Sequence, residues 1–178
     1  MKQIQILAFS FLIVCCVQCK KSSNATDVPG LPPATQVGAN TFGCLVNGVV
    51  FKPTTRNDLS LDLDLGFNNG IMGIVAYMIV DANNSSMIVI GVTDSLRTYP
   101  PPRIYKINGK DMGFISYSKR NFCTMESYDG VTISNGSLSI SKLDLNNQIV
   151  SGTYEVTLVN KLCTDTVRIT NGRFDIKF

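Results

Sequence analysis

From residue 41 to the C-terminus, hydrophobic residues stand in short runs or alternate with polar ones, and turn-forming residues separate the runs. Residues 59–65 show the alternation most clearly, because every second position is a leucine and the positions between are serine or aspartate. A period of two is that of a β-strand with one buried face. No window has the period of an amphipathic helix, so the pattern predicts an all-β domain.

Further strands are expected at residues 71–80, 87–92, 104–107, 113–118, 122–127, 137–145 and 149–159. Asn47-Gly48 separates the apolar residues 44–46 and 49–51, and Asn171-Gly172 separates residues 167–169 and 174–176, which alternate apolar and charged, so tight type I′ hairpins are favoured at both places. Asn135-Gly136 is also expected to form a turn. Many strands joined by short turns predict an antiparallel meander that forms a β-sandwich or a flattened barrel.

Two of these segments, residues 71–80 and 87–92, are apolar at nearly every position. Such strands are usually covered on both faces, so we expect them in mid-sandwich or under a covering loop.

The N-terminus has the layout of a signal peptide. Residues 1–5 carry one positive charge and no acid, and residues 6–14 form an apolar run too short to span a bilayer, which takes about 20 residues. Polar sequence then begins at Cys19, which predicts a lipoprotein signal over residues 1–18 and acylation of Cys19.

Cys16 is the alternative lipid acceptor. Gln18 occupies the position before Cys19, where a small residue is preferred, whereas the small Cys15 precedes Cys16. An ordinary secretory signal with incidental cysteines is the other interpretation. Residues 19–40 are rich in Ser, Asn, Thr, Pro and Gly and are expected to be the acylated cysteine and a flexible, disordered tether. Residues 41–178 then form the all-β domain.

The composition excludes several kinds of chemistry. The chain contains no histidine, so Ser-His-Asp and Cys-His mechanisms are excluded, as are histidine-ligated metal sites. With 16 Lys and Arg against 13 Asp and Glu, no strongly basic face for nucleic acid is expected. We therefore expect no cofactor, no nucleic-acid partner and no enzymatic activity.

Asp62 and Asp64 are the first candidate site. Alternate strand positions stand about 7 Å apart, which suits two carboxylates that share a calcium ion or hydrolyse a glycoside together with a second acid. The candidates for that second acid are Glu126, Asp129 and Glu155. The competing interpretation is an ordinary solvated strand face, and we expect no metal.

A stiff triproline segment carries the second candidate site. Arg97, Tyr99, Arg103 and Tyr105 surround it and form a candidate ligand rim for a carboxylate or a sugar. The alternative is a rigid loop whose prolines only end strands.

Three cysteines remain in the domain. Cys123 and Cys163 lie in polar surroundings and are the candidate disulfide, which would close a loop of about 40 residues and contribute roughly 3–4 kcal/mol. Cys44 is then expected to be a small buried apolar residue.

The two ends of the domain carry recognisable segments. LPPATQ followed by GANTFGCLVNG near its start, and ITNGRFDIKF at its end, resemble the corresponding segments of a family of uncharacterised Bacteroidota lipoproteins. The resemblance implies an envelope lipoprotein with a β domain and transfers no catalytic residues. Residues 20–23 lack the acidic cluster associated with surface export in that group, so we expect the outer membrane with the domain facing the periplasm.

These observations predict a lipid-anchored envelope protein that acts as a non-enzymatic binding or structural module. Its expected partners are the membrane, through the anchor, and an envelope protein or glycan. The alternatives are a carboxylate-based glycan hydrolase and a lipocalin-like carrier of an apolar ligand, which would need an apolar cavity.

Overall fold

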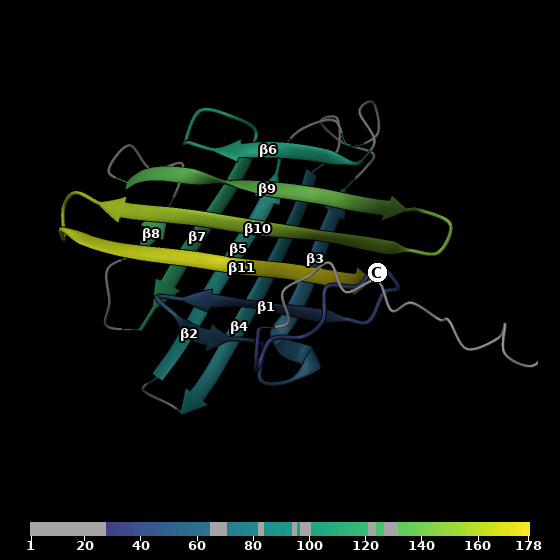
Figure 1. The fold of residues 1–178 in the computed structure, drawn as a ribbon, viewed down its shortest axis with the longest axis horizontal. Coiled ribbons are helices and arrows are strands. Elements are labelled where there is room, and N and C mark those ends of the chain that lie inside the picture. Colours follow the sequence, from purple (N-terminus) through teal and green to yellow (C-terminus); the bar gives the residue numbers. More distant parts are fainter. Residues whose placement is uncertain are drawn as a thin grey trace, which may run out of the picture.

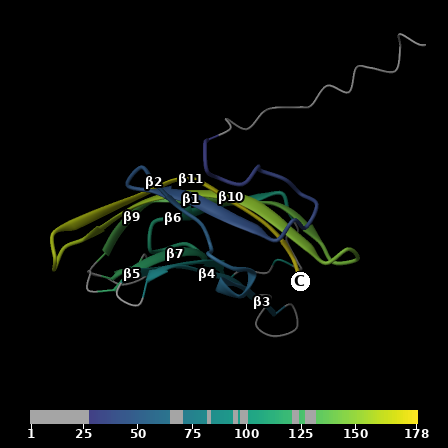
Figure 2. The same ribbon diagram turned by 90° about the horizontal axis from the view of Figure 1, so that it is seen from below.

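The computed structural model describes residues 28–64, 71–81, 84–93, 96, 101–120, 124–126 and 132–178. Eleven strands form two antiparallel sheets that pack face to face (Figures 1 and 2). The six-stranded sheet has the order β2-β1-β11-β10-β9-β6. Its strands are β1 (Thr41–Val46), β2 (Val49–Phe51), β6 (Arg103–Ile107), β9 (Thr132–Asp144), β10 (Ile149–Asn160) and β11 (Asp165–Lys177).

The five-stranded sheet has the order β3-β4-β5-β7-β8. Its strands are β3 (Leu59–Asp64), β4 (Ile71–Asp81), β5 (Asn84–Val92), β7 (Gly113–Lys119) and β8 (Met125–Glu126), and a 3-10 turn, η2 (Arg56–Asp58), precedes β3. The strands of the two sheets cross at a steep angle in Figure 1, as in orthogonally packed sandwiches. The predicted all-β antiparallel fold is confirmed, and across the described strands it is a sandwich whose sheets do not close into a barrel.

The chain passes repeatedly between the two sheets, so the fold is more than a simple meander. In the six-stranded sheet, β1 and β2 form one hairpin and β9, β10 and β11 follow one another as two more, while β1 at the start of the domain pairs with β11 at its end. The two terminal strands are therefore central neighbours, and the sheet forms only when the whole domain has been assembled.

The two Asn-Gly pairs have different roles. Asn47 and Gly48 both have positive φ values, 49° and 83°, and make the predicted tight turn between β1 and β2. Asn171-Gly172 lies inside β11 instead, where the register slips against both neighbouring strands and Asn171 has a φ of 54°. The predicted second hairpin is wrong: the Asn-Gly pair forms a β-bulge, because strands on both sides of β11 continue the ladder past it.

Asn135-Gly136 also lies within a strand, β9, and forms no turn. Gly136 allows the close approach of β10, since a Cβ at this position would overlap the backbone carbonyl of Glu155. A glycine in a strand can thus mark tight contact with the neighbouring strand.

The core lies between the sheets and is aromatic on one side. Phe42, Phe51, Tyr154 and Phe174 project from the six-stranded sheet, and the rings of Phe42 and Tyr154 lie 5.4 Å apart. Isoleucines and methionines of β4, β5 and β7 cover them from the other sheet.

The other face of β4 and β5 points outward. Tyr77 and Ile79 there are 41% and 47% exposed. The apolar runs of these strands are therefore covered on the inner face, and among the described residues no further layer lies over the outer one.

Candidate functional site

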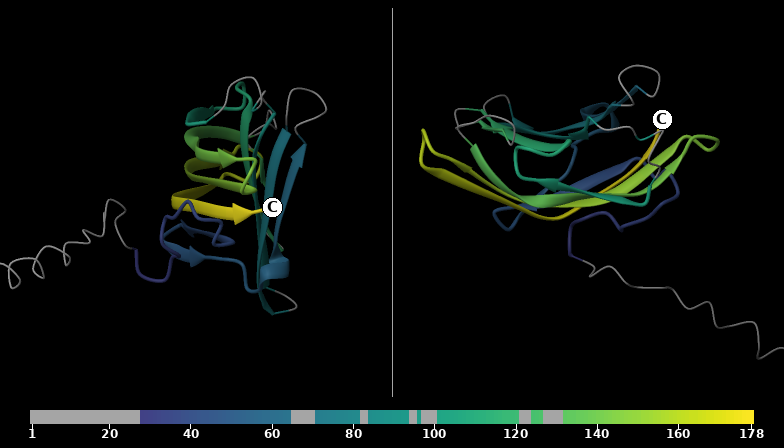
Figure 3. Two further views of the ribbon diagram at one scale, coloured as in Figure 1. Left: turned by 90° about the vertical axis from the view of Figure 1, so that its right-hand side faces the viewer. Right: turned by 90° about the horizontal axis from the view of Figure 1, so that it is seen from above.

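A segment before β1 crosses the outer face of the six-stranded sheet. We call residues 31–39 the strap. It lies on the side of this sheet that faces away from the five-stranded sheet (Figures 2 and 3). Pro32 packs over Gly43 of β1, and its carbonyl oxygen accepts a hydrogen bond from Arg173 of β11 at 3.2 Å. Their composition predicts a flexible tether, but these residues contact the domain along their length.

Asp175 of β11 holds the strap. Its carboxylate accepts three backbone hydrogen bonds, from the N–H groups of Val37, Gly38 and Ala39 at 3.0, 2.8 and 3.2 Å. The hydroxyl groups of Thr35 and Ser151 donate two more, at 2.6 and 2.8 Å. Asp175 is only 1% exposed, so a buried carboxylate is satisfied almost entirely by a segment that lies within the predicted tether.

The electrostatics of Asp175 follow from these contacts. Burial alone would raise the pKa of this carboxyl, but the hydrogen bonds from the strap and from Ser151 outweigh burial and hold the pKa below its usual value. The carboxylate is therefore charged at neutral pH, which is the state that can accept all five bonds.

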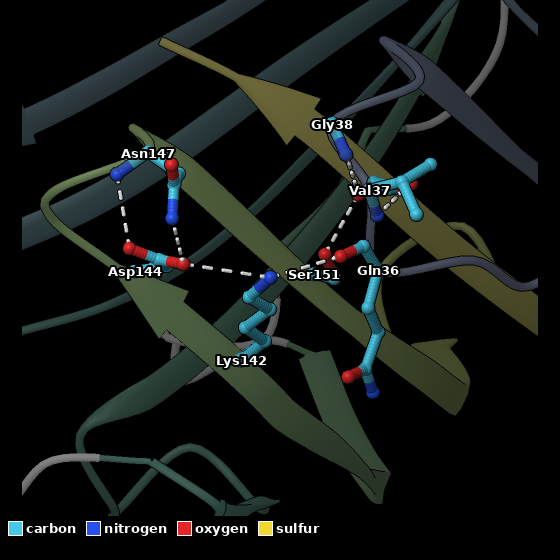
Figure 4. A network of polar contacts seen from close by, with 8 residues as sticks. Gln36, Val37, Gly38, Lys142, Asp144, Asn147 and Ser151 are labelled. Carbon is cyan, nitrogen blue, oxygen red and sulfur yellow. Dashed lines mark hydrogen bonds and ion pairs between the residues drawn. The ribbon is translucent and has the colours of Figure 1, made fainter.

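At Gln36 the strap also reaches the hairpin between β9 and β10 (Figure 4). Lys142 donates to the carbonyl oxygen of Gln36 at 3.1 Å and lies 3.6 Å from the carboxylate of Asp144. Asp144 in turn accepts two hydrogen bonds from Asn147, which cap the turn and lower the pKa of Asp144. The strap is thus tied to β1, β11 and β9.

The candidate rim is only partly described. Arg97 and Tyr99 lie outside the described residues. Tyr105 projects from β6 toward the sandwich interior and is 5% exposed, and the Arg103 guanidinium lies 5.1 Å from the centre of its ring. Since Tyr105 is a core residue, only Arg103 of the two described members is partly accessible.

The acidic candidates divide between different parts of the molecule. Asp62 and Asp64 stand opposite Gly73 and Ile71 in β3, an edge strand of the five-stranded sheet, and their side chains lie outside the described part. Glu155 is exposed on the outer face of the other sheet, beside Thr153 and Arg173. Glu155 therefore lies in a different layer from β3. The side chains of Glu126 and Asp129 are not described, and within the described part no cluster of three acidic or cysteine side chains could hold a metal.

Cys163 is disulfide-bonded. Its expected partner, Cys123, lies outside the described residues, so this pairing stays a prediction, and so do the lipid acceptor positions Cys19 and Cys16. Cys44 is fully buried and reduced, and burial raises the pKa of its thiol to about 12. The Tyr154 hydroxyl beside it has no hydrogen bond of regular geometry, and burial raises its pKa well above the usual value.

A slot opens between the two sheets at the end where β2 faces β4, β5 and β7. We call it the end slot; it has a volume of about 390 Å³ and is lined by Val46, Asn47, Val49, Val50, Phe51, Met78, Val80, Asn84, Ser86, Tyr117, Lys119 and Val167. It forms because β2 has only three residues, whereas β4 has 11 and runs on beyond it (Figure 1). Sequence patterns did not indicate it, since the lining residues come from six separate strands.

A larger but shallower hollow of about 670 Å³ lies between the ends of the strap and residues 52–59. Thr54 there binds both the N–H and the C=O of Ile79, each at 3.0 Å, which fixes this connection to β4. The Thr54 hydroxyl, which lines this hollow, is therefore used in holding the fold.

Comparisons of the chain with protein-family models, with curated proteins and with solved structures give no match. The Bacteroidota resemblance thus stays a prediction. No helix among the described residues is long and apolar enough to cross a membrane.

Proposed function

We propose that this protein is a lipid-anchored module of the bacterial cell envelope that acts by binding a partner. The strap is the observation that supports this function best. A tether that entered the domain through a loose junction would let the domain tumble, whereas Asp175 fastens the strap to the last strand with four hydrogen bonds. The domain would then keep the outer face of its six-stranded sheet toward the anchor.

This orientation leaves the five-stranded sheet and the end slot accessible from the envelope space. The outer face of β4 presents Tyr77 and Ile79, and Val49 and Val80 border the slot with 67% and 63% exposure. Exposed apolar groups of this kind commonly mark binding surfaces. The absence of histidine from the sequence favours binding over acid-base or nucleophilic catalysis.

Metabolic labelling tests the anchor. Cells that express the full chain would be grown with an alkyne-bearing fatty acid, and the protein would be examined for covalent label. We expect label in the wild type and in Cys16→Ser, and its loss together with release from the membrane fraction in Cys19→Ser. Label lost only in Cys16→Ser would move the anchor to that residue, and label retained in both single variants and in the double variant would overturn lipid anchoring at these cysteines.

Protease treatment of intact and permeabilised cells tests the orientation. The expected periplasmic location protects the domain until the outer membrane is opened. Cleavage in intact cells would instead place the domain on the cell surface.

A further inference from the structure

We propose that the end slot binds a free single-chain fatty acid, with its alkyl chain between the sheets and its carboxylate beside Lys119. This deepens the proposed function by naming a ligand class. It rests on that function only in taking the protein as a binding module, because the slot lies in the domain and does not involve the lipid anchor.

The first support is the order of side chains along the inner face of the five-stranded sheet. Two cross-strand rows run from the core to the opening. Ala76, Ile88 and Tyr117 form the innermost row, and Met78, Ser86 and Lys119 the next. At the mouth, Asn84 pairs with Asp81, and Val80 lies in the register shift just before that pair. On the β4 side the slot is thus apolar along its depth. Lys119, the one lysine or arginine among its described lining residues, lies at the side of the entrance.

The second support is the opposite wall. Val46 pairs with Val49 in the last rung between β1 and β2, and Val167 of β11 lies behind them. Edge strands that face water are usually protected by charged side chains, especially lysine. Here the edge strand β2 presents Val49 at one lip of the opening, with 67% exposure, and the other lip is Val80 at the end of β4, with 63% exposure.

The third support is the size and charge of the slot. Its volume of about 390 Å³ falls in the range of small-molecule sites, roughly 300–1,000 Å³. Lys119 is the only ionisable lysine, arginine or acid among the described lining residues, so the field at the mouth favours a monoanion. Each CH₂ that enters removes apolar surface from water on both the alkyl chain and the valine lips.

Two polar side chains, those of Tyr117 and Ser86, line the slot close to Lys119. The Tyr117 hydroxyl is hydrogen-bonded to Ser86, and both side chains are nearly buried, at 6% and 5% exposure. Because the two groups satisfy each other, they add no unpaired polar atom to the slot. An alkyl chain can therefore pass them without losing a hydrogen bond.

Calorimetric titration with laurate, below the concentration at which it forms micelles, tests the proposal. The protein used begins at Lys20, after the expected lipid acceptor Cys19, so that no acyl chain of the anchor competes with laurate. We expect saturable binding of one laurate. The cationic dodecyltrimethylammonium, which has the same alkyl length, should bind about fivefold more weakly or worse, because it meets Lys119 with like charge.

Methionine methyl NMR supplies a site-specific reading in the same titration. The Met78 methyl group lines the slot, whereas Met112 is 56% exposed on the turn between β6 and β7. Laurate should shift the Met78 resonance in proportion to occupancy and leave Met112 unchanged. Equal shifts at both, or no shift at Met78 while heat is released, would place any binding elsewhere and overturn the proposal.

Paired variants separate the slot from general surface effects. Val80→Asp should weaken laurate binding about tenfold, because it puts a negative charge at the mouth, while Ile104→Asp at a 70% exposed position of the other sheet should not. Lys119→Gln should weaken binding about two- to fivefold and Lys106→Gln not at all.

Three further results would overturn the proposal: no binding of laurate, equal effects of the slot variants and their controls, or a stable dimer that Val80→Asp converts to monomer. The last result would mean that a second copy of the chain covers the slot. Failure of this titration leaves the labelling experiment unaffected, so loss of the slot and loss of the anchor are distinguishable.

Discussion

Replacing Asp175 by asparagine tests whether the strap is part of the folded domain. The two carboxylate oxygens accept different numbers of hydrogen bonds. Oδ2 accepts from Thr35, Val37 and Ala39, and Oδ1 accepts from Gly38 and Ser151. An asparagine oriented with its carbonyl at the Oδ2 position keeps three of these bonds.

The loss therefore comes from the Oδ1 position. The amide NH₂ would face the N–H of Gly38, which becomes an unsatisfied donor, whereas the Ser151 hydroxyl can rotate to accept. A lost hydrogen bond to a charged group plus one unsatisfied N–H costs about 2–3 kcal/mol in unfolding free energy. For a domain of this size, that lowers Tm by about 4–12 °C.

Thermal unfolding and amide hydrogen exchange together check this expectation. Asp144→Asn is the matched control, since Asp144 also accepts a backbone N–H bond but lies at an exposed turn, and its Tm should change by a small fraction of that amount. Exchange of the Val37, Gly38 and Ala39 amides should accelerate only in Asp175→Asn. Equal Tm values for the two variants, with unchanged exchange at 37–39, would refute the role of Asp175.

The pH dependence has a definite sign. The pKa of Asp175 is lower in the folded state than the value of about 3.9 expected in the unfolded chain, so its contribution is fully present above that value. The stability difference between wild type and Asp175→Asn should be constant near neutral pH. It should shrink below about pH 4, where the unfolded chain takes up a proton before the folded state does, and be lost as the pH falls through the folded pKa. A difference that grew with acidification would contradict this reasoning.

Three further predictions concern the packing. Gly152→Ala should lower the unfolding free energy by more than about 2 kcal/mol, because its Cβ would overlap the Ser139 carbonyl, whereas Gly73→Ala, with open space around the new methyl group, should be nearly neutral in the same denaturant titration. Asn171→Ala should cost about 1–2 kcal/mol because alanine disfavours a φ of 54°, and Asn171→Gly should restore most of it; equal stability would argue against the bulge. The Cys44 thiol, with a pKa of about 12, should resist a maleimide at pH 8 until urea unfolds the domain, and rapid labelling of the native protein would show that the core opens there.

Local patterns identified the strands well but not their neighbours. Alternation at 59–65 and the runs at 71–80, 87–92 and 149–159 correspond to β3, β4, β5 and β10 within one to three residues at each end. The Asn-Gly signal was right at Asn47 and wrong at Asn171, although both asparagines have positive φ. The turn and the bulge share a positive φ at the asparagine, but Gly48 also has a positive φ and Gly172 does not, and the strands beside the pair decide which of the two forms.

The strap shows a similar limit. It is rich in proline and small or polar residues and has few large apolar side chains whose burial could offset the loss of chain entropy. The sequence therefore predicts a flexible tether here. The alternation of Asp175 with Phe174 and Ile176 predicts an outward-facing polar residue. It is outward-facing, but the strap covers it, and a contact across 136 to 140 residues leaves no local pattern.

The sequence by itself determined the all-β class, most strand positions and the burial of Cys44, because these depend on side-chain alternation and local backbone preference. Only the tertiary structure decided the pairing of β1 with β11, the seat of the strap on Asp175 and the opening of the end slot. Each of these depends on which distant segments become neighbours and on how far one strand extends beyond another. Residue order encodes such contacts only through the packing of the whole domain.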